Sequence, residues 1–240
     1  MAVPNTGSDI GQTPPAAPEF VPGPILLLGA PGAGKGTQAK GMVAAWKVPQ
    51  ISTGDLLRSN KERGTALGLA ATQIMAEGKL VSDDLVNRMV ADRLTEPDSA
   101  RGYILDGFPR TLGQAEWLDH YLAQQDNVLP VIAVSIRVDY NQLLRRITGR
   151  RSCPSCGSIY NVYLQPPKLD ERCDLDGTLL ARRQDDTEEV FNERMRTYNA
   201  QTAPVIEHYR ALGQFEEVDG DLPVAEVTAA VLSGIVRLRS

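Results

Sequence analysis

The stretch "PILLLGAPGAGKGTQAK", from Pro24 to Lys40, decides the fold. It begins with the apolar run "ILLL", which is typical of a short buried strand. A loop with four glycines, two lysines and no acid follows directly, from "GAPGAG" onward. Beyond the loop, four apolar side chains recur at helical spacing, at Ala39, Met42, Val43 and Trp46. The stretch therefore predicts a strand, a glycine-rich loop and a helix in succession.

The loop has the pattern Gly29-x4-Gly34-Lys35 of a phosphate-binding loop. Its glycines let backbone N–H groups turn toward an anion, the following helix adds its positive end, and Lys35 adds a full charge. The general motif places Ser or Thr after the lysine to hold Mg²⁺, whereas this chain has Gly36 there and Thr37 one place later. We therefore expect a nucleotide-phosphate site, with Thr37 only a candidate metal contact. A glycine-rich turn without a ligand is the alternative.

Two further apolar runs predict strands, "GYILDG" at residues 102–107 and "VLPVIAVSIRV" at residues 128–138. Helix starts are indicated at four positions, near Thr53 and at Ser82, Thr187 and Pro223. Short buried strands that alternate with helices predict an α/β fold with a doubly wound parallel sheet and helices on both faces. Ligands bind such a sheet at the carboxyl ends of its strands, which is where the glycine loop lies.

Composition narrows the classes of protein. Hydrophobic residues make up 42% of the 240 residues, enough for a core, and no apolar run approaches the ~18 residues of a membrane span. The net charge of −5 argues against a protein that coats nucleic acid. Residues 1–23 are rich in proline, without lysine or arginine, and fit neither a signal peptide nor a mitochondrial presequence. We expect a disordered tail there, either native or added by cloning.

The segment from residue 150 to residue 186 interrupts the alternation of strands and helices and holds all three cysteines. Cys153 and Cys156 form a "CPSC" pair, and Cys173 and Asp176 follow with the spacing of a zinc ribbon whose fourth ligand is a carboxylate. The spacing predicts a structural Zn²⁺ site in a small inserted domain. Asp170 and Asp174 are alternative fourth ligands with poorer spacing, and three free thiols are the other alternative.

Six motifs occur in order along the chain: "GAPGAGKGTQ", "STGDLLR", "GKLVSDD", "DGFPRT", "GRR" and "RRQDD". Together they closely resemble the adenylate kinases of the long-lid type, over residues 24–240. The resemblance implies a P-loop NTPase-like core made of residues 24–51, 82–148 and 187–240. It also implies a helical AMP-binding insert (residues 52–81) and a lid (residues 149–186). Lids with this cysteine spacing resemble the zinc-bearing kind, in which the fourth ligand is Cys or Asp.

The resemblance also implies roles for individual residues. The ATP side comprises Gly32, Ala33, Gly34, Lys35, Gly36, Thr37, Arg146, Arg150, Ile159 and Tyr160. The AMP side comprises Thr53, Arg58, Lys79, Leu80, Val81, Gly107, Phe108, Pro109, Arg110, Gln114, Arg183 and Arg194, with Gln114 reading the base. The catalytic set comprises Lys35, Asp106, Arg110, Arg150, Arg183 and Arg194, in which Asp106 faces Mg²⁺. Asp185 and Asp186 are expected to pair with lid arginines.

The chemistry of phosphoryl transfer explains why arginines recur in these motifs. The acceptor phosphate is already a nucleophile, so catalysis consists of positioning and of neutralising crowded negative charge. Arginine grips phosphate oxygens in pairs and keeps its charge. We therefore expect the reaction MgATP + AMP ⇌ 2 ADP in a cytoplasmic monomer that binds Mg²⁺ and Zn²⁺ but neither nucleic acid nor membrane. The alternatives are a kinase of the same fold with another acceptor or donor, a zinc-ribbon protein that binds nucleic acid, and an inactive nucleotide sensor.

Overall fold

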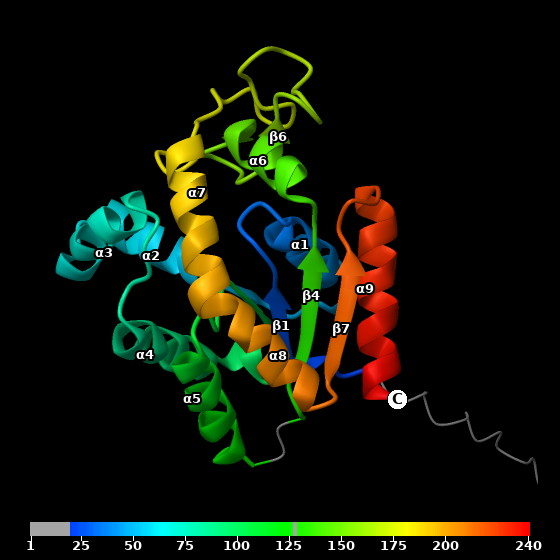
Figure 1. Cartoon of the computed structure of the whole chain (residues 1–240). Coiled ribbons are helices and arrows are strands. Elements are labelled where there is room, and N and C mark those ends of the chain that lie inside the picture. Colours follow the sequence, from blue (N-terminus) through cyan, green and yellow to red (C-terminus); the bar gives the residue numbers. More distant parts are fainter. Residues whose placement is uncertain (1–19, 127–128) are drawn as a thin grey trace, which may run out of the picture.

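A computed structural model describes residues 20–126 and 129–240, and its centre is a five-stranded parallel sheet covered by helices (Figure 1). The strand order is β2-β3-β1-β4-β7, and each neighbouring pair is parallel. The strands are β1 (Gly23–Leu28), β2 (Gln50–Ser52), β3 (Gly102–Asp106), β4 (Ile132–Arg137) and β7 (Phe215–Asp219). The predicted α/β fold with a doubly wound parallel sheet is confirmed.

Helices lie on both faces of the sheet (Figure 1). Those of the core are α1 (Lys35–Trp46), α4 (Asp83–Leu94), η1 (Pro97–Ser99), α5 (Leu112–Ala123), α6 (Tyr140–Thr148), α7 (Glu188–Thr197), η2 (Tyr198–Thr202), α8 (Ala203–Ala211) and α9 (Val224–Arg239). No helix within residues 20–126 and 129–240 is both long and apolar enough to cross a membrane.

Strand β1 is buried on both faces, which explains its unbroken apolar sequence. Successive strand residues point to opposite faces, so Ile25 and Leu27 pack with α1 and α9 in one core layer. Leu26 and Leu28 pack in the other layer, with side chains of α4, α5 and α8. Burial of a whole Leu or Ile side chain contributes roughly 1.5–3 kcal/mol. This strand therefore anchors the glycine loop to the most buried part of the molecule.

The order in which strands are added to the sheet switches sides at β1. Strands β2 and β3 lie on one side of β1, and β4 and β7 lie on the other. Residues 29–34 leave the carboxyl end of β1, and residues 107–110 leave the carboxyl end of neighbouring β3. A crevice at this switch point is where open α/β sheets bind ligands. The topology therefore places the two loops that the sequence marks for nucleotide binding next to each other.

Two peripheral segments flank this edge (Figure 1). Residues 52–81 form helices α2 (Thr53–Glu62) and α3 (Ala66–Ala76), which pack on each other to one side of the sheet. Residues 149–186 begin with an antiparallel hairpin of β5 (Arg150–Ser152) and β6 (Ile159–Asn161) and lie beyond the carboxyl ends of the strands. The rod formed by α7, η2 and α8 runs from this segment down along the sheet.

The observed elements differ from the expected ones at several places. The disordered tail was expected to extend to residue 23, but ordered structure begins earlier. Gly23 is the first residue of β1, and the Phe20 ring packs on Trp46 with ring centroids 5.3 Å apart. Residues 1–19 lie outside the described part of the chain. The expected strand at residues 128–138 is shorter, since β4 begins at Ile132. The sequence analysis did not predict β2 and β7.

Candidate functional site

The glycine loop enters α1 without a side-chain cap. Gly34 is the N-cap residue, and no side chain accepts a hydrogen bond from the first turn. Gly32 and Gly34 have φ of 87° and 95°, a region that side chains with a Cβ rarely adopt. A Cβ on Gly32 would also lie 3.0 Å from the Leu143 carbonyl oxygen. The loop therefore leaves backbone N–H groups and the positive helix end facing the same crevice, as anion binding requires.

Lys35 is the first residue of α1 and follows the glycine loop directly. Its Nζ donates hydrogen bonds to the carbonyl oxygens of Gly29 (2.8 Å) and Ala30 (3.0 Å). Burial lowers the pKa of Lys35 from 10.5 to about 8, and the positive charges of three nearby arginines add to this lowering, whereas Asp106 opposes it. The ammonium group is therefore held at a place where a positive charge is costly until an anion approaches.

Four predicted arginines share the crevice. The positive charges of Arg110, Arg150 and Arg194 each lower the pKa of Lys35. Burial lowers the pKa of Arg194 to about 10; Asp185 opposes this shift, and the positive charges of Arg150 and Arg110 add to it. Burial together with Arg150 and Arg58 lowers the pKa of Arg183 to about 10. Positive groups that depress one another's pKa are destabilised by mutual repulsion. A bound polyphosphate would relieve that repulsion.

Carboxylates hold two of these four arginines in place. Arg150 makes a two-pronged ion pair with Asp186, which is fully buried, and Arg194 Nη1 donates to Asp185 Oδ2 at 2.9 Å. The expected pairing of Asp186 with a lid arginine is therefore present, but Asp185 pairs with Arg194 of α7 instead. Within residues 20–126 and 129–240, no carboxylate or carbonyl accepts a hydrogen bond from Arg183.

Asp106 ends β3 and lies beside the glycine loop. Gln50 Nε2 donates a hydrogen bond of 2.9 Å to its Oδ2 atom. A Cβ on Gly36 would lie 3.5 Å from the same oxygen. A carboxylate oxygen next to a phosphate-binding loop is the kind of ligand that Mg²⁺ prefers, directly or through water. Thr37, the other candidate metal contact, is exposed.

The turn after β3 contains the predicted AMP-side residues 107–110. Thr53 Oγ1 and Arg110 Nε both donate to the Gly107 carbonyl oxygen, at 2.8 Å and 2.7 Å. The Phe108–Pro109 peptide bond is cis. The structure thus joins the start of α2, this turn and the Arg110 side chain in one hydrogen-bonded unit.

Gln114 lies on α5 under the same turn. Its side chain is almost fully buried, its Oε1 accepts from the Arg110 backbone N–H at 2.7 Å, and its Nε2 donates to Asp83 Oδ1 at 2.7 Å. Asp83 Oδ2 also accepts from Thr111 Oγ1 at 2.6 Å. The structure therefore shows Gln114 bracing the turn, and base recognition by this residue stays a prediction. This link between Gln114 and Asp83 was missed from the sequence.

Other predicted residues contact neighbouring protein groups. The Lys79 ammonium pairs with Glu77 at the surface, and Arg146 Nη2 donates to the Gly220 carbonyl oxygen at 2.8 Å. Arg58 pairs with Asp55 within α2. Of the remaining AMP-side residues, Val81 packs in the core and Leu80 is half-buried. Their contacts with nucleotide stay predictions.

The lid residues predicted to touch ATP have different surroundings. Ile159 is exposed, whereas Tyr160 is buried with Cys173 and Leu180 in a small apolar cluster. The Tyr160 hydroxyl accepts from the Asp174 backbone N–H at 2.8 Å and lies 3.5 Å from Cys173 Sγ. The structure therefore gives Tyr160 a packing role in the lid.

The four predicted metal ligands come together at the tip of the lid. The ligand atoms of Cys153, Cys156, Cys173 and Asp176 all lie within 4.8 Å of one another. Both Asp176 carboxylate oxygens are 3.5 Å from Cys153 Sγ, and Cys156 Sγ is 3.5 Å from Cys173 Sγ. Tetrahedral ligands at ~2.3 Å from zinc would be ~3.8 Å apart, so the spacing and the donor types fit Zn²⁺.

The pKa values of these ligands are shifted in different directions. Hydrogen bonds from Thr178, whose N–H lies 3.0 Å from Asp176 Oδ1, hold the pKa of Asp176 well below its usual range. Hydrogen bonding with Ser158 lowers the pKa of Cys156, whereas burial raises that of Cys153. A bound cation would favour the thiolate form of all three cysteines. Asp170 and Asp174, the alternative ligands, are not part of the cluster.

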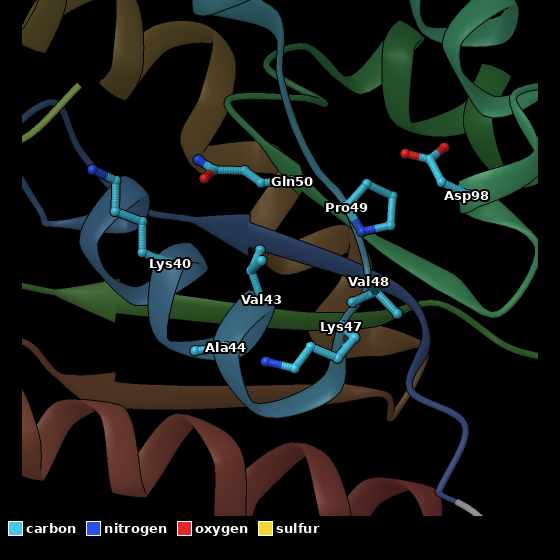
Figure 2. Close-up of a pocket in the computed structure, with 8 residues that line it drawn as sticks. All are labelled: Lys40, Val43, Ala44, Lys47, Val48, Pro49, Gln50 and Asp98. Atoms are coloured by element: carbon cyan, nitrogen blue, oxygen red, sulfur yellow. The ribbon is translucent and has the colours of Figure 1, made fainter. Parts of the chain in front are cut away.

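A separate pocket of about 610 Å³ lies between α1 and the segment that enters β2 (Figure 2). Its lining consists of Lys40, Val43, Ala44, Lys47, Val48, Pro49, Gln50 and Asp98. None of these residues belongs to the predicted nucleotide site. Gln50 lines this pocket, and its amide donates the hydrogen bond to Asp106 at the end of β3. The role of Gln50 was missed from the sequence, although Gln50 stands only two positions before the motif "STGDLLR", which starts at Ser52.

Comparisons with known proteins agree with this geometry. A family model described as adenylate kinase matches residues 27–214. An adenylate kinase of Nitrosococcus oceani is 47% identical over 203 residues, which cover 84% of this chain and 93% of that protein. Adenylate kinases of Desulforudis audaxviator and Methanocella arvoryzae are 46% and 45% identical, and each match covers 89% of this chain and 99% of the relative. The chain therefore belongs to the adenylate kinase family.

Proposed function

We propose that this nucleoside monophosphate kinase transfers the γ-phosphoryl group of MgATP reversibly to AMP and so forms two ADP. One observation carries the proposal beyond the family membership. Lys35, Arg110, Arg150 and Arg194 crowd together at the switch point of the sheet, close enough for the arginines to lower the lysine's pKa. Two polyanionic substrates that meet there would neutralise this cationic cluster, which neither a single phosphate nor a neutral ligand would do.

On the ATP side, the backbone N–H groups of residues 32–37 would bind the phosphates, and Lys35 would exchange its loop carbonyls for phosphate oxygens. Arg150 would bind the same phosphates from the lid, and Arg146 would pack against the adenine. Ile159 would contact ATP from inside the lid. Tyr160 would act through the packing of the lid hairpin, because its hydroxyl is already hydrogen-bonded.

On the AMP side, Arg58 and Arg110 would bind the monophosphate, with Thr53 and the turn at residues 107–109 as one wall. Lys79, Leu80 and Val81 would form the opposite wall, and Gln114 would contact the base. Arg183 and Arg194 would lie between the two nucleotides and bind the group in transfer. Because the phosphate of AMP is itself the nucleophile, these residues position it and neutralise charge rather than move protons.

Magnesium fits the donors at the end of β3. Asp106 offers carboxylate oxygens beside the phosphate-binding loop, and oxygen ligands suit this hard cation. Bound with ATP, Mg²⁺ would supply charge neutralisation to the phosphates. The chain's own part is to hold the carboxylate at that position.

We propose a structural Zn²⁺ at Cys153, Cys156, Cys173 and Asp176. Four protein ligands leave no open position for chemistry. The lid's own apolar cluster consists of only four buried residues, two of them these cysteines, so a metal would supply much of its stability. The lid tip also contacts the core, because Lys40 Nζ donates to the Gly157 carbonyl oxygen at 2.9 Å. A rigid lid at this place would exclude water from the phosphoryl transfer. A monomer in the cytoplasm stays a prediction.

The deciding experiment is a nucleotide panel. Purified protein with MgATP is offered AMP, CMP, UMP and GMP in turn, and the diphosphates are separated by chromatography. We expect rapid formation of ADP with AMP alone, and no product from Lys35→Met protein that remains folded. A pyrimidine diphosphate as the main product would overturn the AMP assignment and the role of Gln114. The absence of transfer to every acceptor would refute the kinase reaction.

A further inference from the structure

We propose that Gln50 is a positioning residue, which fixes Asp106 with a hydrogen bond in place of the hydroxyl that this phosphate-binding loop lacks. The inference rests on the proposed function, since it concerns the carboxylate that faces magnesium. In the general motif, Ser or Thr after the lysine holds Mg²⁺ next to an acid at the end of a strand. Gly36 has no side chain to do so.

The hydrogen bond is specific. Gln50 Nε2 lies 2.9 Å from Asp106 Oδ2, in a partly buried position. Within residues 20–126 and 129–240, no other group donates a hydrogen bond to the Asp106 carboxylate. One carboxylate oxygen is thus held by the amide, and Oδ1 remains available to the metal or to its water. An amide donor suits this task because it carries no charge and so leaves the carboxylate fully negative for a cation.

Gln50 and the missing hydroxyl converge on the same oxygen. A Cβ built on Gly36 would lie 3.5 Å from Asp106 Oδ2 and 3.9 Å from Gln50 Nε2. Both are ordinary contact distances, so a serine at position 36 fits here and its hydroxyl would reach the oxygen that Gln50 now holds. The Gln50 amide therefore makes the contact with Asp106 Oδ2 that a hydroxyl at position 36 would otherwise make.

The backbone of Gln50 is fixed independently of this contact. Gln50 is the first residue of β2. Just before it, the Pro49 carbonyl oxygen accepts a hydrogen bond of 2.9 Å from the Ile104 N–H. Asp106 lies opposite Ser52 in the same parallel ladder. Figure 2 shows the Gln50 amide on the side of Lys40, away from Lys47. The sheet thus sets the distance between the amide and the carboxylate, which is what precise positioning requires.

The test replaces Gln50 with methionine, which keeps the length of the side chain and removes the donor. Metal binding is measured without turnover, by titrating Mn²⁺ in the presence of a non-hydrolysable ATP analogue and following its electron paramagnetic resonance. We expect Q50M to weaken Mn²⁺ binding and to lower kcat, each about tenfold, as loss of an outer hydrogen-bond partner does at metal sites. The KM for AMP should stay close to that of the original protein.

A matched pair of double variants separates positioning from packing. Q50M combined with Gly36→Ser returns a donor to Asp106 and should recover most of the lost Mn²⁺ affinity. Q50M combined with Gly36→Ala adds only the Cβ and should recover none. Unchanged Mn²⁺ affinity and kcat in Q50M, with a lower melting temperature alone, would overturn the proposal and leave Gln50 a structural brace. Because Mn²⁺ binding is read without catalysis, failure of the proposed reaction would be seen separately, in the nucleotide panel.

Discussion

Lys35 should make the stability of the protein depend on alkaline pH in a particular direction. Burial lowers its pKa from 10.5 to about 8. Between these values the unfolded chain still holds the proton that the folded chain has released. Stability rises with pH wherever the unfolded state binds more protons. The contribution of Lys35 to the free energy of unfolding should therefore increase between about pH 8 and about pH 10.5.

The size of the effect follows from the same shift. A fall in pKa from 10.5 to about 8 corresponds to about 3 kcal/mol, at ~1.4 kcal/mol for each pH unit. Below pH 8 the folded protein keeps a charged ammonium group in a half-buried place beside three arginines, and it bears this penalty in full. Lys35→Met removes the titrating group. The difference in unfolding free energy between the original protein and the variant should thus change by about 3 kcal/mol across this pH range.

The assay is urea unfolding of both proteins at pH 7, 8, 9 and 10 at constant ionic strength. Lys40→Met is the matched control, since Lys40 is exposed on the same helix. In parallel, calorimetry of a non-hydrolysable ATP analogue should show affinity that falls as pH rises through about 8 in the original protein but not in Lys35→Met. A pH-independent difference between the original protein and Lys35→Met would refute the claim that Lys35 is desolvated and electrostatically crowded.

Two further predictions concern the lid. Removal of metal by a strong chelator should lower the melting temperature and release about one zinc per chain, measured by elemental analysis. Asp176→Ala should weaken metal retention. A metal-free protein of equal stability and activity would contradict the zinc site. Asp186→Asn leaves the Arg150 charge without its buried partner and should cost about 3 kcal/mol in urea unfolding. The more exposed Asp185→Asn is its comparison and should cost less.

The sequence predicted the centre of the fold because its signals there are local. "ILLL" is apolar throughout since β1 is buried on both faces, and the loop after it needs glycine where φ is positive, as at Gly34. The edge strand β7 lacked such a signal. Its sequence, "FEEVD", has only two apolar residues, and Val218 is the only buried one. Edge strands depend on pairing with a neighbour, which local sequence does not encode.

The metal cluster was predictable from the sequence, whereas the contacts of other candidate site residues were not. Cysteine spacing predicted the lid cluster because Cys153 and Cys156 are separated by only two residues. Cys173 and Asp176 then follow at a sequence spacing that is typical of zinc ribbons. The partners of Gln114 and Asp106 could not be found in this way. Asp83 lies 31 positions from Gln114, and Gln50 lies 56 positions from Asp106. Such pairs form only through the packing of separate elements, so they have no fixed spacing.

The ion pairs of the crevice also indicate which arginines can move to substrate. The Arg58–Asp55 pair lies within one helix with Asp55 largely exposed, and exposed pairs contribute less than about 1 kcal/mol. A phosphate can therefore displace Asp55 at little cost. Arg150 is bound by a fully buried Asp186, and separating such a pair costs several kcal/mol. Arg150 should thus stay on Asp186 and meet phosphate with its remaining N–H groups. The proposed AMP side would then be adaptable, whereas the proposed ATP side would be fixed in advance.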